Sequence, residues 1–208
     1  MSDLRNSLVE LAERAFRRES PFEMLQGLEV PTPFELDLLH IEEDAAVEVN
    51  QLAHKGYIAS LRGEIEGSCY NALSSRINEL FRTRRLDPRP QIPLRHDADR
   101  KGGLRVLRKI KHELMTSGWR RLKGGRFQKD FGAYWIQLWF DPGTYVDNLS
   151  AYLAVGPPRI SVDLEKFFDI SLHEYLFFGP PEEFEKNLRA LLVLVDCLAQ
   201  GLKELLDS

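Results

Sequence analysis

YWIQLWF, residues 134–140, is the clearest strand pattern in this chain of 208 residues. Because side chains alternate between the two faces of a strand, Trp135, Gln137 and Trp139 share one face, and the residues between and beside them share the other. Both faces are therefore largely apolar. A half-exposed strand carries polar side chains on its water-facing side, so this pattern predicts that each face is either covered or used for binding.

Two interpretations of this strand remain open. In the first, the C-terminal helix covers one face, and the other face is covered by the helix that begins near Leu104 or by the N-terminal half of the chain. In the second, Trp135 and Trp139 form a partner or ligand surface, because tryptophan offers a large contact area at little entropic cost. Gln137 between them would then supply polar specificity.

Turn signals on either side of the strand extend the pattern into an antiparallel meander. Gly124-Gly125 and Asp141-Pro142-Gly143 are typical turn sequences. The segments they separate read as short strands, and the whole pattern predicts about four strands at residues 119–122, 126–131, 134–140 and 149–155. Helical periodicity from Leu104 to Ser117 predicts a helix before this meander.

A long helix is predicted at the C-terminus, opened by Pro180-Pro181. Its large apolar residues alternate in steps of four and three. This heptad pattern is short and is widened by further leucines, so it favours a globular packing face over a coiled coil. The positions on that face are Phe184, Leu188, Leu191, Val195, Leu198, Leu202 and Leu205.

The first hundred residues predict helices and then a linker. Apolar spacing indicates a short helix that ends before Pro21, and Thr32-Pro33-Phe34-Glu35 resembles the start of a second helix. Residues 47–81 are helical in pattern, with glycines that mark a break. The sequence therefore predicts an α+β protein with a helical region at residues 1–83, a charged Pro/Gly linker at residues 84–103 and an α+β domain at residues 104–208.

Charge is distributed unevenly along the chain. The net charge is -4. Residues 82–129 carry 16 of the 28 Lys and Arg but only 4 of the 32 Asp and Glu, while residues 19–54 carry nine carboxylates and no Lys or Arg. This segregation indicates a partner surface and not a reaction.

The basic residues gather on one stripe of the helix that begins near Leu104. Steps of about 100° per residue place them opposite its apolar face. The basic surface of residues 101–129 predicts binding to an acidic protein or to the acidic segment 19–54. It could also be only a solvated face. The alternative function is nucleic-acid binding, although no base-reading motif accompanies the basic residues. The candidate binding residues are Lys101, Arg105, Arg108, Lys109, His112, Arg120, Arg121, Trp135, Gln137 and Trp139.

Motifs for catalysis, metals and cofactors do not stand out. His96-Asp97-Ala98-Asp99 has metal-capable side chains but favours a solvated loop, and Cys69 and Cys197 lie in apolar helical contexts typical of buried thiols. We expect no metal and no cofactor, and an enzyme whose site is invisible in the sequence is the third interpretation. The absence of a signal peptide and of a long apolar run predicts a cytoplasmic protein that does not bind membranes.

Several short motifs carry a resemblance to a known family. They are Ser117-Gly118-Trp119-Arg120-Arg121, the basic hairpin with Phe127, Trp135-Ile136-Gln137-Leu138, and the run from Leu149 to Gly156. In this layout, residues 104–206 resemble a family of bacterial α+β domains of unknown function. The resemblance implies an α+β fold and contributes no catalytic residues, because none are established for that family. Together with the charge pattern it predicts a non-enzymatic accessory, adaptor or immunity-like protein that binds another protein, in an unknown oligomeric state.

Overall fold

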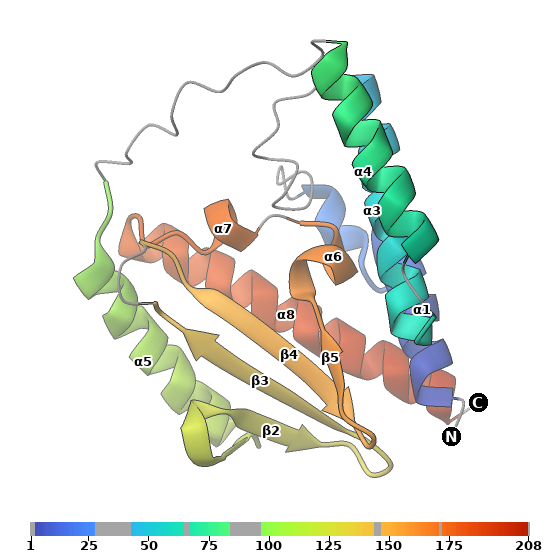
Figure 1. Ribbon diagram of the computed structural model, residues 1–208. Coiled ribbons are helices and arrows are strands. Elements are labelled where there is room, and N and C mark those ends of the chain that lie inside the picture. The colour runs from blue at the N-terminus through green and yellow to red at the C-terminus, as the bar shows by residue number, and fades with distance from the viewer. Residues whose placement is uncertain are drawn as a thin grey trace. The chain divides into compact units, whose positions relative to one another are not determined.

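A computed structural model describes residues 3–27, 43–64, 67–83, 97–143, 147–170 and 172–207. The chain forms two compact units: unit 1 consists of Met1–Leu94 with Glu165–Ser171, and unit 2 consists of Arg95–Leu164 with Leu172–Ser208. The predicted α+β class is confirmed, because helices and an antiparallel sheet both occur (Figure 1). The predicted division at residues 84–103 did not assign residues 165–171 to the N-terminal part.

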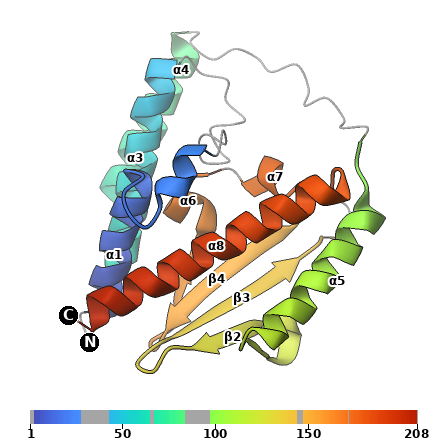
Figure 2. The same ribbon diagram turned by 180° about the vertical axis from the view of Figure 1, so that it is seen from behind.

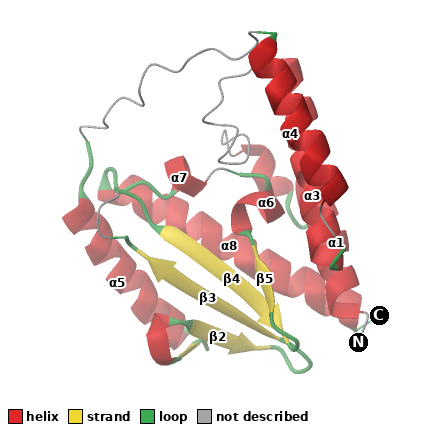
Figure 3. Cartoon of the chain, viewed as in Figure 1, coloured by secondary structure: helices red, strands yellow, loops and turns green. Residues whose placement is uncertain are grey.

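Unit 2 contains a five-stranded antiparallel sheet whose strands follow one another in chain order. Figure 3 shows β2 to β5 of this sheet. The predicted meander is confirmed, with one more strand than expected, because Ile160–Val162 pairs with the preceding strand over only three residues. So short a segment carries almost no alternation that could identify it. The strands are β1 Arg120–Arg121, β2 Phe127–Asp130, β3 Trp135–Asp141, β4 Ser150–Gly156 and β5 Ile160–Val162.

Two long helices, α5 (Arg100–Thr116) and α8 (Pro181–Leu206), lie on the same face of this sheet (Figure 2). Of the seven predicted packing positions of α8, all but Leu205 are buried. The hydroxyl of Tyr134, the residue just before β3, donates a 2.5 Å hydrogen bond to the Ala199 carbonyl of α8, and burial raises the pKa of Tyr134 to about 12. None of the described helices has an apolar stretch long enough to cross a membrane.

The helix α5 begins four residues before the predicted start at Leu104. Asp99 caps it by accepting a 2.8 Å hydrogen bond from the Gly102 backbone N–H. A Cβ at Gly103 would lie 2.2 Å from Phe178 Cδ1, so only glycine permits this approach. The two glycines that suggested a linker therefore belong to a buried helix start. Residues 84–96 of that predicted linker lie outside the described residues.

Unit 1 is helical. Its elements are α1 Asp3–Phe16, the 3-10 helix η1 Glu23–Gly27, α3 Glu43–Arg62 and α4 Gly67–Arg82. The predicted break in the helical pattern is confirmed at Gly63, whose φ of 77° ends α3 in the left-handed region that glycine favours. The helix predicted at Thr32–Glu35 lies outside the described residues, as do the side chains of residues 65–70.

Residues 165–171 join unit 1 through Arg18. This guanidinium donates hydrogen bonds to the carbonyls of Phe168 at 2.8 Å and Asp169 at 3.0 Å, and it lies 3.5 Å from the Asp169 carboxylate. Phe167 and Phe168, at the end of the short helix α6 (Leu164–Phe168), are fully buried with Phe22, at ring-centroid distances of 6.4 and 5.8 Å. The aromatic pair is thus part of a core.

Candidate functional site

The predicted basic stripe lies on the exposed side of α5. The side chains of Lys101, Arg105, Arg108 and His112 are all exposed, and the opposite side of the helix is buried. We call these four residues the α5 row. Their spacing of four, three and four residues places them one above another on the helix surface.

Lys109 was predicted in the same stripe, and the structure gives it a different role. Its Nζ lies 2.9 Å from Glu185 Oε1 on α8, and Arg189 of α8 reaches back to Glu113 of α5 at 3.0 Å. Hydrogen bonds from Lys109 and Arg189 lower the pKa of Glu185. Lys109 thus belongs to an ion-pair network that joins the two helices. By contrast, the part of the chain that the structure describes offers the α5 row no ion-pair partner.

The two predicted arginines after α5 also differ from each other. Arg120 and Arg121 are exposed on β1, and Arg120 forms a 3.3 Å ion pair with Asp130 of β2. Burial, and then the positive charge of Arg121, lower the pKa of the half-buried Lys111 on α5. Arg121 therefore adds to the positive potential at the end of α5, whereas the charge of Arg120 is offset by its carboxylate partner.

The tryptophan face of β3 is the second candidate surface. Tyr134 bonds to α8, so alternation places Trp135, Gln137 and Trp139 on the opposite face of the sheet. The possibility that the helix from Leu104 covers this face is wrong, because α5 lies beside α8 (Figure 2). The geometry places the three residues together, with both tryptophans half-buried and Gln137 buried.

Residues of the neighbouring strands partly cover the tryptophan face of β3. Trp139 stacks on Tyr152 of β4 at a centroid distance of 5.1 Å, and the Arg159 guanidinium lies 5.6 Å from the Trp139 ring. A Cβ at Gly156 would lie 2.3 Å from the Trp135 ring, so that indole rests against the glycine. Tyr152 remains 42% exposed. The face therefore presents aromatic and cationic groups of the kind found at the centres of protein interfaces.

A chain of amides crosses the same face. Gln137 Nε2 donates to Gln128 Oε1 at 2.8 Å, and Gln128 Nε2 donates to Asp130 Oδ1 at 2.6 Å. Because an ionised carboxylate only accepts, Asp130 orients Gln128 and, through it, Gln137. This order leaves Gln137 Oε1 buried with no hydrogen-bond partner among the described residues. A buried acceptor of this kind costs about 1–3 kcal/mol until an N–H or O–H group reaches it.

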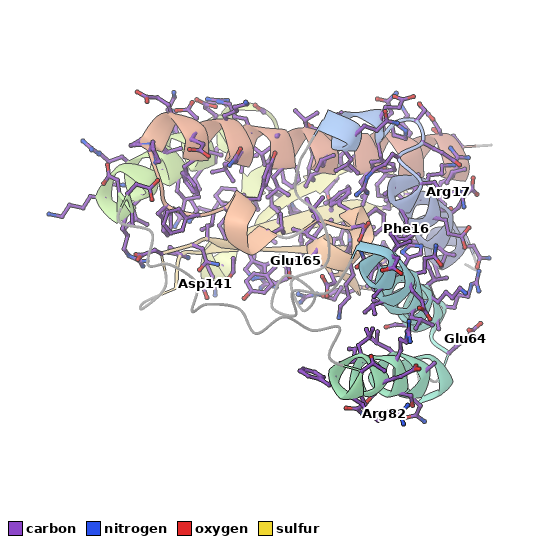
Figure 4. The ribbon with its side chains drawn as sticks, turned by 90° about the horizontal axis from the view of Figure 1, so that it is seen from above. Phe16, Arg17, Glu64, Arg82, Asp141 and Glu165 are labelled. Atoms are coloured by element: carbon purple, nitrogen blue, oxygen red, sulfur yellow. The ribbon has the colours of Figure 1, made fainter. Side chains whose placement is uncertain are left out.

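Unit 1 contains a polar cluster that the sequence did not indicate. The Phe16 ring lies between α1 and α3 and stacks on His54 at 4.0 Å (Figure 4). Burial, and to a lesser degree the Arg17 charge, lower the pKa of His54 from 6.5 to about 4. His54 Nδ1 and, one turn earlier on α3, Asn50 Oδ1 are buried with no hydrogen-bond partner among the described residues. His54 is therefore a neutral imidazole at physiological pH.

This low pKa predicts a pH dependence of stability. His54 binds a proton more readily in the unfolded chain than in the folded protein. Above about pH 7 it therefore leaves the free energy of unfolding unchanged, and as the pH falls from 6.5 toward 4 it lowers that free energy. The full difference between the unfolded and folded pKa values of His54 corresponds to about 3 kcal/mol. His54→Phe keeps a ring beside Phe16 and cannot be protonated, so its melting temperature is expected to fall less than that of the wild type between pH 7 and pH 4.5. Equal slopes for the two proteins would contradict the assignment.

Metal ligands do not gather in the described part of the chain. No group of three His, Cys, Asp or Glu side chains there could hold a metal ion. His96, the first residue of the metal-capable sequence motif, lies outside the described residues. Cys197 is half-buried on α8.

No protein-family model, curated protein or solved structure matches this chain. The resemblance of residues 104–206 to bacterial domains of unknown function therefore stays a prediction.

Proposed function

We propose that this protein is a non-enzymatic accessory or adaptor protein of the cytoplasm that binds an acidic protein partner through the α5 row. One observation carries the proposal: Lys101, Arg105, Arg108 and His112 are exposed in a row with no ion-pair partner among the described residues. Lys109 on the same helix is paired with Glu185. Among the described residues, a carboxylate thus neutralises Lys109 next to the row, and none neutralises the row itself.

Repulsion between the like charges of the row destabilises α5, and a partner would remove this repulsion. Like charges three or four residues apart on a helix destabilise it by about 0.2–0.5 kcal/mol per pair. Carboxylates on a partner would replace this repulsion with attraction and would steer the encounter at low ionic strength. Such binding is expected to weaken as salt is added, since exposed charges are screened over about 10 Å at 0.1 M salt.

The charges around the row favour a protein over a nucleic acid. Glu182 and Glu183 are exposed in the first turn of α8. That turn lies beside the start of α5, because a Cβ at Gly102 would meet Pro181 at 2.5 Å. Carboxylates beside a cationic row repel a phosphate backbone, whereas a protein surface can present both signs of charge to match them.

Charge reversal tests the proposal. Arg105→Glu with Arg108→Glu is expected to abolish capture of the partner from the native cell and to leave the melting temperature nearly unchanged, because both side chains are exposed. The matched control is Lys186→Glu with Lys203→Glu, two exposed lysines of α8, which should capture the partner as the wild type does. The identified partner is then purified, and its Kd is measured for the three proteins at several salt concentrations.

Two results would overturn the proposal. The first is partner capture by the Arg105→Glu, Arg108→Glu protein at wild-type strength. The second is submicromolar binding of an oligonucleotide near physiological salt, with a log-log salt slope steeper than about -3, as three or four phosphate contacts would give. That second outcome would assign the α5 row to nucleic-acid binding.

A further inference from the structure

The α5 row continues into an apolar residue. Met115 is the next position on the same line of the helix, three residues after His112, and its side chain is 43% exposed. At about 100° per residue, the row and Met115 fall within roughly 80° of the helix circumference, opposite the buried Ile110. The surface therefore combines three cationic groups and the imidazole of His112 with one apolar contact at the C-terminal end of α5.

The spacing of the row matches another helix better than an extended chain. With a rise of about 1.5 Å per residue, steps of four, three and four residues cover about 6, 4.5 and 6 Å, or roughly 16 Å in all. Carboxylates with the same spacing on a neighbouring helix stay in register along the whole row. Alternate residues of an extended strand are about 6.8 Å apart, so four of them span about 20 Å and lose register.

We propose that the occupant of the α5 row is an amphipathic helix of the partner protein. It carries carboxylates at positions i, i+4, i+7 and i+11, and an apolar residue one turn beyond one end of that line contacts Met115. The inference rests on the proposed function and adds the conformation and residue spacing of the bound segment. Because the four–three–four order reads the same in both directions, the carboxylates alone fit either orientation, and the apolar residue at the Met115 end selects one.

Two synthetic helical peptides of identical composition test this inference. Both have 18 residues on an alanine and glutamine background with four glutamates and one leucine. In the row peptide the glutamates follow the four–three–four spacing, with the leucine three residues before the first; in the dispersed peptide the same residues are distributed around the helix. Full-length protein is titrated against each labelled peptide by fluorescence anisotropy, and the row peptide is expected to bind about tenfold more tightly.

Variants identify the surface that the peptide uses. Arg108→Glu should weaken binding of the row peptide about tenfold or more. Met115→Ser should remove the part of the affinity that the leucine contributes and keep the part that the glutamates contribute. Lys186→Glu with Lys203→Glu is again the control and should bind as the wild type does. Circular dichroism of each peptide confirms equal helicity, so that a difference in affinity reports the spacing.

The outcomes separate this inference from the proposed function. If both peptides bind equally and Arg108→Glu weakens both, the helical spacing is wrong, and binding of acidic proteins stands. If neither peptide binds, the helical occupant is ruled out. If neither peptide binds and a 20-nucleotide oligo(dT) does bind, the proposed function falls as well.

Discussion

Val195→Asp is expected to unfold unit 2. Val195 is 1% exposed on α8, and its neighbours on the packing face, Leu191 and Leu198, are fully buried. The substitution places a carboxylate in an apolar core, which costs more than about 4 kcal/mol. The expected result is insoluble protein, or a protein whose tryptophan emission matches that of the denatured wild type.

The matched control lies two residues earlier on the same helix. Val193 is 46% exposed, so Val193→Asp makes the same chemical change at the surface and should alter the free energy of unfolding by about 0.5 kcal/mol or less. A Val195→Asp protein that keeps the wild-type melting temperature would show that α8 is not part of the core.

Arg18→Leu is expected to have the second largest effect, in unit 1. The guanidinium bonds to the carbonyls of Ala15, Phe168 and Asp169. Burial raises the pKa of Asp169, while the charge of Arg18 acts in the opposite direction. Leucine would leave the Phe168 and Asp169 carbonyls and the Asp169 carboxylate without this donor, at a cost of about 3–5 kcal/mol, while the Ala15 carbonyl keeps the backbone N–H of residue 18.

The readout must report on unit 1 alone. All three tryptophans, Trp119, Trp135 and Trp139, belong to unit 2, so their fluorescence does not follow this change. Hydrogen exchange of the α1 amides should accelerate by two orders of magnitude or more in Arg18→Leu. The control is Arg14→Leu on α1, which removes only an exposed pair with Glu10 and should cost less than about 1 kcal/mol. Equal exchange rates in the two variants would contradict the role of Arg18.

The residues of the candidate surfaces could be predicted from the sequence, but the contacts of these residues with other elements could not. Steps of about 100° placed Lys101, Arg105, Arg108 and Lys109 on one stripe of α5, and all four are exposed. Only the packing of α8 against α5 shows that Lys109 is paired with Glu185, because that contact joins residues 76 positions apart. Helical periodicity specifies the side of the helix on which a charge lies, and not which charge of another element meets it.

On the tryptophan face, too, the local pattern did not predict the contacts with other strands. Alternation along β3 placed Trp135, Gln137 and Trp139 together. Tyr152 and Gln128 join them only through strand register, which sets Trp139 opposite Tyr152 and Gln137 opposite Gln128. A shift of one residue would have turned each strand's side chains to the other face, so the amide chain depends on pairing that no local pattern reports.

The sequence by itself determined the elements whose signals are local. Apolar periodicity identified α5 and α8, turn glycines separated the strands, and Pro181 opened α8, because each of these depends on residues within a few positions. The tertiary structure alone decided the burial of Gly103 against Phe178, the addition of β5 to the sheet and the inclusion of Glu165–Ser171 in unit 1. Gly103–Phe178 and Arg18–Asp169 join positions 75 or more residues apart, and β5 is too short to stand out without its partner strand. Their free energy comes from contacts that form only when the chain has folded.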